Sequence, residues 1–260
     1  PLVPAGLGAM VVQVADRPIL LHLTDGATVG VYQANYRLGI FMMLVVSMFD
    51  QAWRPFYLER AGKPEAPALM ARVLTLFVAG ASWLALGLSF FLPDLVRLEV
   101  AGRTLIHRAY WEGLPIVPVV LFAYVVHGAY VNFLAPVTVA KKTEAIAAVT
   151  LVGATVNVLA NVLLIPRFNM AGAAWATFLA YAVMAWQMHW FGRQSWPVPY
   201  EWGTVAAALA PVLAAGGLAW LLSGRLDGGN WFLARTALLL AVPVCWVGVF
   251  GRPNLKQALS

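Results

Sequence analysis

The chain has 260 residues, of which 62% are hydrophobic and only 11% are charged, whereas soluble globular domains carry about 45–50% apolar and about 25% charged residues. This composition excludes a water-soluble fold, because such a fold could not bury so much apolar surface. The net charge of +6 is spread over short polar joints, so it does not require a nucleic-acid partner.

The apolar residues form repeated blocks that are long enough to cross about 30 Å of hydrocarbon as helices. Blocks such as FMMLVVSMF do not alternate as the strands of a membrane barrel do. The sequence therefore predicts an all-α polytopic membrane protein with about eight transmembrane helices. The expected spans are 2–23, 27–49, 69–92, 114–138, 144–165, 170–191, 203–223 and 231–250.

Eight spans place both ends of the chain on one side of the membrane. The lysines all fall in the joints and tail of that side, which the positive-inside rule assigns to the cytoplasm. The chain begins at Pro1 inside an apolar run, without a Met or a basic segment before it, so we expect a fragment that lacks upstream sequence. Cys245 has no second cysteine to pair with, and we interpret it as a packing residue.

Charged residues occur inside the first two predicted spans. Asp16 and Arg17 lie before the turn TDGAT and Arg37 lies after it, and an arginine at the centre of a membrane helix costs about 2.5–3.5 kcal/mol. In one interpretation Asp16 pairs locally or with Arg37, and Arg17 extends toward the interface. In the other, Arg17 and Arg37 line a cavity for an anionic group. Pro18 is expected to kink the helix beside them.

The segment around Arg37 adds further polar and aromatic side chains, namely Tyr32, Gln33, Asn35 and Tyr36. Gln33 and Arg37 share a helix face at a spacing of four residues, with Tyr36 adjacent. This stripe suits a sugar or a lipid head group, but it also suits helix packing. The candidate substrate-binding residues are thus Arg17, Arg37, Gln33, Asn35 and Tyr36.

A second group of intramembrane polar residues could couple ions or form a polar network: Asp16, Asp50, His127, Asn132, Asn157 and Asn161. Asp50 has a simpler interpretation, since Arg54 follows it at the i+4 position of a helix. His127 and Asn132 could relay protons or contact substrate, or they could be packing residues with satisfied hydrogen bonds.

A face of small and polar residues is predicted in the span 144–165. Gly153, Asn157 and Asn161 recur every four residues, a spacing that usually holds membrane helices together.

No sequence motif for nucleotide hydrolysis or metal binding is present. The chain lacks a Gly-rich phosphate loop with its Lys and Ser/Thr, an HExxH pair and a Cys/His ligand set. We therefore expect no metal, no cofactor and no enzymatic activity.

Several stretches resemble a known family when taken in order: VADRPILLHLTDGATVGVYQANYRLG, SMFDQAWRPF, AKKTE and NVLANVLLIPRFNMAGAAWATFLAY. They are similar to motifs of the Wzx-type polysaccharide (O-antigen and exopolysaccharide) flippases of the multidrug/oligosaccharidyl-lipid/polysaccharide (MOP) exporter superfamily. The resemblance covers nearly the whole chain. It departs from the family pattern at Asn169, where the family usually has Gly and where we expect Asn to adopt the left-handed conformation.

The resemblance implies helices seven to fourteen of a fourteen-helix transporter. Residues 1–191 would form its six-helix C-terminal lobe, and residues 192–260 two additional helices and a cytoplasmic tail, with the N-terminal lobe missing. It implies alternating access in the bacterial cytoplasmic (inner) membrane, where an undecaprenyl-diphosphate-type lipid-linked oligosaccharide is flipped for O-antigen, lipopolysaccharide or exopolysaccharide biosynthesis. Its partners would be this substrate, membrane lipids and polysaccharide assembly proteins.

Two other functions remain open from the sequence. One is a multidrug or organic-cation antiporter of the same superfamily, which would favour an acidic and aromatic cavity. The other is a membrane-bound O-antigen polymerase or ligase. Its support is the charged joint between the third and fourth spans, which contains Arg97, Arg103, His107, Arg108 and Glu112.

Overall fold

The computed structural model describes residues 2–100 and 103–250. Their first half contains α1 (Leu2–Val14), α2 (Asp16–Leu23), α3 (Gly26–Tyr36), the 3₁₀ turn η1 (Arg37–Gly39), α4 (Ile40–Arg60), α5 (Ala66–Arg97), β1 (Glu99–Val100), β2 (Arg103–Thr104) and the 3₁₀ helix η2 (Arg108–Ile116). The second half contains α6 (Val117–Val139), α7 (Thr143–Phe168), α8 (Met170–Ser195), α9 (Trp202–Leu222) and α10 (Gly228–Phe250).

Six helical segments are long and apolar enough to cross a membrane: Gly26–Arg60, Ala66–Arg97, Arg108–Val139, Thr143–Phe168, Trp202–Leu222 and Gly228–Phe250. Among the remaining helices, α8 has 26 residues, and α1 and α2 follow each other with a break at Ala15. The predicted class, an all-α multi-pass membrane protein, is confirmed.

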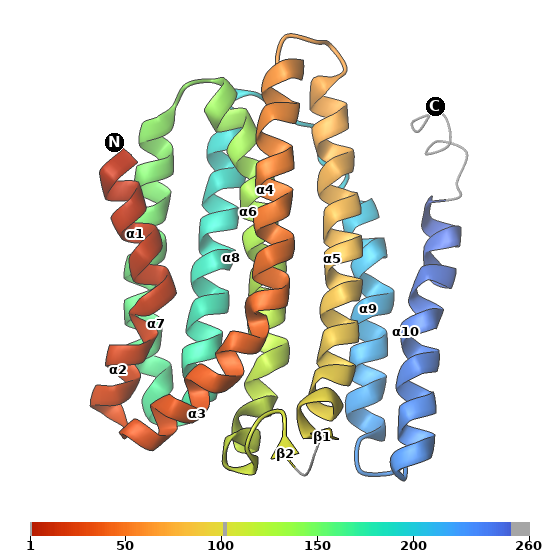
Figure 1. The fold of residues 1–260 in the computed structure, drawn as a ribbon. Helices are drawn as coiled ribbons and strands as arrows, with labels where there is room; N and C mark the ends of the chain where they lie inside the picture. The colour runs from red at the N-terminus through yellow and green to blue at the C-terminus, as the bar shows by residue number, and fades with distance from the viewer. Residues whose placement is uncertain (1, 101–102, 251–260) are drawn as a thin grey trace.

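The long helices run up and down between two ends of the molecule (Figure 1). The connections α4–α5, α6–α7 and α8–α9 lie at the end where α1 begins and α10 ends, and α2–α3, α7–α8 and α9–α10 lie at the other. This alternation agrees with the order of spans predicted from the sequence. The helices are longer than predicted, because α4 continues to Arg60 and α5 reaches Arg97. Charged residues at the end of a membrane helix can continue the helix into the wet interface.

Helix α6 is at the centre of the bundle and packs against α4, α5 and α8, while α7 packs against α8 and α1. Close approach depends on glycines at two of these crossings. A Cβ at Gly128 of α6 would overlap the ring of Phe77 on α5, and one at Gly153 of α7 would overlap Met184 on α8. These helices therefore need a residue without a side chain where they cross.

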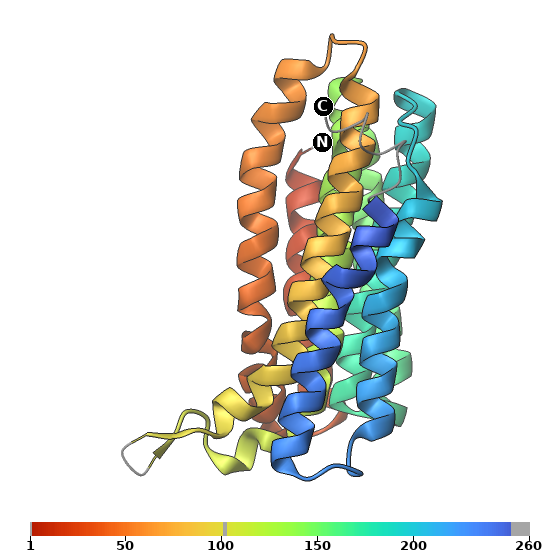
Figure 2. The same ribbon diagram turned by 90° about the vertical axis from the view of Figure 1, so that its right-hand side faces the viewer.

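Helices α9 and α10 pack on the far side of α5 around a separate apolar cluster (Figure 2). This cluster contains Leu86, Phe90, Val212, Ala215, Ala219 and Val242. Beside it, Arg235 of α10 pairs with Asp94 of α5 at 2.5 Å and also donates to the carbonyl of Phe90. Arg235 is buried, with 5% of its surface exposed.

The connection between α5 and α6 is structured rather than an irregular joint. Strands β1 and β2 pair antiparallel, and Figure 2 shows this hairpin projecting from one end of the bundle. The following η2 lies against α3, where the side-chain amide of Asn35 donates to the carbonyl of Tyr110 at 2.7 Å.

Candidate functional site

The break between α1 and α2 shapes the site. Pro18 has no N–H to offer the carbonyl four residues earlier, and its ring clashes with that carbonyl. The residue four positions earlier is Val14, where α1 ends, and α2 begins at Asp16. The break between the two helices thus lies one turn before Pro18.

Asp16 is fully buried and joins α2 to α3. Its carboxylate accepts a 2.6 Å hydrogen bond from the hydroxyl of Tyr32 and a 2.9 Å bond from the backbone N–H of Arg17. Four ion pairs occur in the described part of the chain, and Asp16 belongs to none of them. The partners of this carboxylate are therefore a phenol and a backbone amide, not the guanidinium of Arg17 or Arg37.

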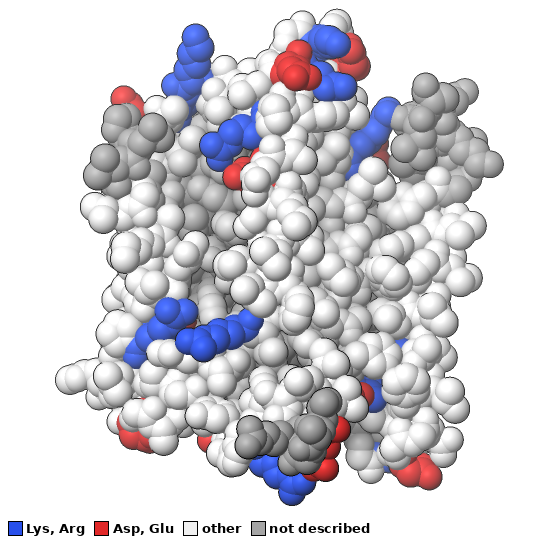
Figure 3. Space-filling model, viewed as in Figure 1, with Lys and Arg blue, Asp and Glu red and all other residues white. Residues whose placement is uncertain are grey.

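Arg17 and Arg37 line one pocket of about 240 Å³. Its other lining residues are Gln13, Val14, Tyr36, Ile40, Met43 and Tyr124, from α1, α3, α4 and α6. Figure 3 shows a hollow in this face between α1 and α4, with Lys or Arg atoms across its lower part. Two cations separated by a turn in the sequence thus meet at one end of a hollow.

The Arg17 guanidinium carbon lies 5.8 Å from the centre of the Tyr36 ring. Within the described residues its Nε is buried and has no hydrogen-bond partner. Arg37 is exposed and lies at the junction of α3 and α4. The pocket therefore offers guanidinium donors and aromatic walls, which suit a phosphate or carboxylate. Its volume fits such a group rather than a whole oligosaccharide.

Gly39 holds the Arg37 segment close to α6. A Cβ at this position would lie 3.2 Å from the Tyr124 ring and would overlap Val120. Since Tyr124 is itself a pocket wall, this close approach sets the distance between Arg37 and α6.

Gln33 and Asn35 do not line this pocket. Asn35 is fully buried, and its amide donates to the carbonyls of Val31 and Tyr110. Gln13 and Tyr124 line the pocket too, although neither was predicted from the sequence. Their helices are apolar on most faces, so the sequence contains no signal for which face meets the hollow.

His127 lies in an aromatic cluster on α6 and α8. Its ring is 4.6 Å from that of Tyr181 and 5.9 Å from that of Tyr130, measured between ring centres. Its Nδ1 is buried and, in the described part, has no hydrogen-bond partner. Asn132 is buried one turn further along, where its carbonyl oxygen accepts from the hydroxyl of Tyr200 at 3.3 Å. These contacts favour the packing interpretation for Asn132.

The remaining predicted polar residues lie in two separate places. Asn157 and Asn161 are fully buried on α7, and the Asn161 amide donates to the backbone and side-chain oxygens of Asn157. Asp50 forms the expected i,i+4 pair with Arg54 at 3.2 Å, and the Arg54 side chain is 62% exposed. The structure therefore brings Arg17, Arg37 and Tyr36 together at the pocket, with Asp16 bonded to the backbone of Arg17, whereas the other candidates do not line the pocket.

The fold and this pocket define a multi-pass helical membrane protein with a cationic, aromatic-walled pocket at one end of a surface hollow. A comparison with known protein families gives no match, and neither does a comparison with curated proteins.

Proposed function

We propose that this chain is the C-terminal portion of a flippase for lipid-linked oligosaccharides, of the MOP superfamily. The observation that carries the proposal is the single pocket lined by Arg17 and Arg37. Isolated arginines in a membrane helix are costly. Two that share a hollow with tyrosines form a site for an anionic group, and the diphosphate of a polyprenyl-linked oligosaccharide is such a group.

In the proposed mechanism, Arg17 and Arg37 hold the diphosphate while the polyprenyl chain stays in the bilayer. In this proposal the hollow between α1 and α4 would face the other lobe of the transporter and contain the sugars. Rocking of the two lobes then exposes the hollow to one side of the membrane and afterwards to the other. The chain has no nucleotide-binding motif, so an ion gradient or the membrane potential would supply the energy.

The contacts of the charged α5–α6 connection support a structural role more than a catalytic one. Arg108 pairs with Glu99 at 2.9 Å, and both side chains are exposed. The Arg97 guanidinium lies 5.4 Å from the ring of Trp111. These charges have local partners, which disfavours a polymerase or ligase that uses them to bind a diphosphate.

The test is complementation of a bacterial strain that lacks its own flippase, with the complete protein carrying Arg17→Ala, Arg37→Ala or both. We expect each single variant to lower surface polysaccharide about tenfold, the factor that about 1.4 kcal/mol of lost binding produces, and the double variant to abolish it. Arg17→Lys keeps the charge but loses bidentate contact, so it should retain part of the activity. Arg225→Ala, in the exposed α9–α10 turn, is the matched control.

Normal polysaccharide from both well-expressed single Ala variants would refute the role of the pocket. Efflux of a cationic dye by the same protein, driven by protons or sodium, would replace the flippase with the antiporter. Polymerisation of glycan by the purified protein would replace it with an enzyme.

A further inference from the structure

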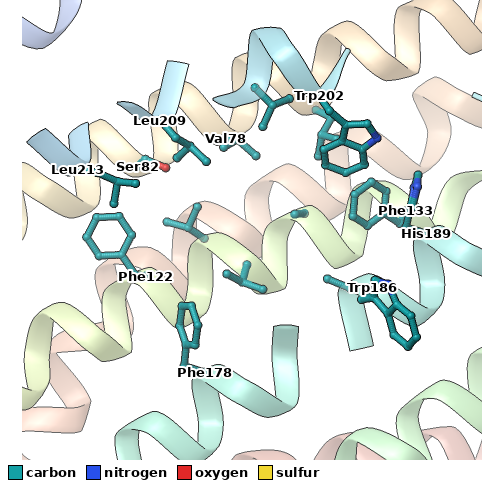
Figure 4. Close-up of a pocket in the computed structure, with 16 residues that line it drawn as sticks. Val78, Ser82, Phe122, Phe133, Phe178, Trp186, His189, Trp202, Leu209 and Leu213 are labelled. Atoms are coloured by element: carbon teal, nitrogen blue, oxygen red, sulfur yellow. The ribbon is translucent and has the colours of Figure 1, made fainter. Parts of the chain in front are cut away.

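A second concavity lies between α8 and α9. These two helices lie on the side of the molecule opposite α4 (Figure 2). It has a volume of about 570 Å³, and its floor is formed by α5 and α6. On α9 it is lined by Trp202, Val205, Leu209 and Leu213, which share one helix face. Figure 4 shows Trp186, His189, Phe133 and Trp202 at one end of this groove and Phe122, Phe178 and Leu213 at the other.

The length of the groove matches one leaflet of a membrane. Trp202 and Leu213 are eleven residues apart on α9, which is about 16 Å at 1.5 Å per residue. A bilayer has about 30 Å of hydrocarbon, so the groove spans about half of it. It also runs parallel to the helices, as the chains of a lipid do.

The groove opens sideways toward the bilayer. Trp186 and Leu213 on its rims are 67% and 64% exposed, whereas Val125 on its floor is 5% exposed. Helix α9 packs against α5 and α10, so the space between α8 and α9 stays unfilled.

The end of the groove near Trp202 is polar and cationic. Trp186 and His189 also line an adjoining pocket of about 490 Å³, together with Trp190, Arg193 and Gln194. Arg193 lies in the last turn of α8 and belongs to none of the ion pairs found among the described residues. His189 Nδ1 is buried and lacks a hydrogen-bond partner in the same part of the chain.

We infer that this groove binds an anionic glycerophospholipid of the adjacent leaflet. One acyl chain fills the groove between α8 and α9, and the phosphate receives donors from Arg193 and His189. Tryptophans beside the head group fit the membrane interface, where such side chains gather. The site is independent of the Arg17 pocket and of the flippase proposal.

The first experiment uses the complete, unaltered protein in nanodiscs that contain phosphatidylglycerol with a diazirine in one acyl chain. After irradiation, adducts mapped by mass spectrometry should concentrate on residues 178–189 and 205–213. The lipid-exposed face of α10, which includes Leu240 at 60% exposure, should carry at least fivefold fewer adducts. An even distribution over α8, α9 and α10 would overturn the inference. This readout needs no mutation, so it does not depend on a variant that folds.

The second experiment compares variants by the number of phosphatidylglycerol molecules retained after purification in a mild detergent. Ala185→Phe fills the groove and should lower retention at least fivefold. Arg193→Gln should lower the preference for phosphatidylglycerol over phosphatidylcholine, while Arg225→Gln should leave it unchanged. Wild-type retention and lipid preference in both Ala185→Phe and Arg193→Gln would refute the site.

Discussion

The hydroxyl of Tyr32 donates a 2.6 Å hydrogen bond to the carboxylate of Asp16. The two residues lie on α2 and α3, on either side of the turn at Thr24 and Asp25. This bond closes the turn and fixes the start of α2, where Arg17 lies one residue further along the chain. A buried carboxylate thus positions the cation that lines the pocket.

Replacing Tyr32 with Phe should destabilise the protein by about 1–3 kcal/mol, because the buried Asp16 carboxylate loses its side-chain donor. Thermal unfolding in detergent measures this as a lower midpoint. The matched control is Tyr110→Phe, at a residue that is 38% exposed. Equal midpoints for the two variants would show that the Tyr32 hydroxyl does not stabilise the turn.

We expect the two residues of the Arg235–Asp94 pair to differ in how much stability is lost when each one is replaced. Asp94→Ala leaves the buried guanidinium without its counter-ion and should cost about 1–3 kcal/mol. Arg235→Met should cost less, since the Asp94 side chain is 45% exposed and remains hydrated, and Met fits the aromatic surroundings. Unfolding midpoints of the two variants and of the double variant measure the difference. The opposite order would contradict the assignment of Arg235 as the buried partner.

Asn169 is strained at the α7–α8 turn. Its φ of 51° with a ψ of −131° lies outside the left-handed helical region expected from the sequence, in a region that only glycine adopts readily. Asn169→Gly should therefore stabilise the protein by roughly 0.5–1 kcal/mol. This is the net value, because the greater entropy of glycine in the unfolded chain offsets part of the relieved strain. Asn169→Ala should destabilise it. A lower unfolding midpoint for Asn169→Gly would contradict this account of the turn.

Asp25 caps the N-terminus of α3, and its carboxylate accepts from the backbone N–H and the hydroxyl of Thr28 at 2.9 and 3.0 Å. These bonds lower the pKa of the Asp25 carboxyl. A lowered pKa in the folded state means that the cap stabilises α3 above the ordinary carboxyl pKa of about 4. This stabilisation is lost as the pH falls through the folded pKa.

Asp25→Ser replaces this cap with one that does not titrate. The difference in unfolding midpoint between the native protein and Asp25→Ser should therefore shift in favour of Ser as the pH drops below about 4. A difference that stays constant from neutral to acidic pH would exclude titration of this cap.

The order and type of the helices could be predicted from the sequence. A membrane span is recognised by the length and apolarity of a continuous stretch of residues, and both can be read directly from the sequence. The α2–α3 turn could be predicted too, because the polar residues and the glycine of TDGAT interrupt the apolar sequence. The predicted ends of α4 and α5 are too early. Charged residues such as Arg60 suggested a connecting loop, whereas the helix continues through them beyond the hydrocarbon.

The site could be predicted only in part, because most helices here are apolar around their whole circumference. A sequence that is apolar on every face does not indicate how a helix is rotated. Arg17 and Arg37 stood out by their charge alone, whereas Gln13 and Tyr124 depend on the packing of α1 and α6. The burial of Arg235 depends in the same way on the docking of α10 against α5.

The flippase proposal requires that Arg17 and Arg37 line a hollow that is wet and receives a lipid-linked oligosaccharide. The direct test introduces Val14→Cys or Met43→Cys, both at the pocket wall, into the complete protein with Cys245→Ala, and measures labelling in membranes by a charged thiol reagent. Leu240→Cys on α10 is the control, since all three positions are exposed at the surface of the chain, by 37%, 39% and 60%. We predict that the two pocket cysteines are labelled, that lipid-linked oligosaccharide slows their labelling, and that the cysteine at position 240 is not labelled. Pocket cysteines as unreactive as the control, or labelling that the substrate does not change, would contradict the claim.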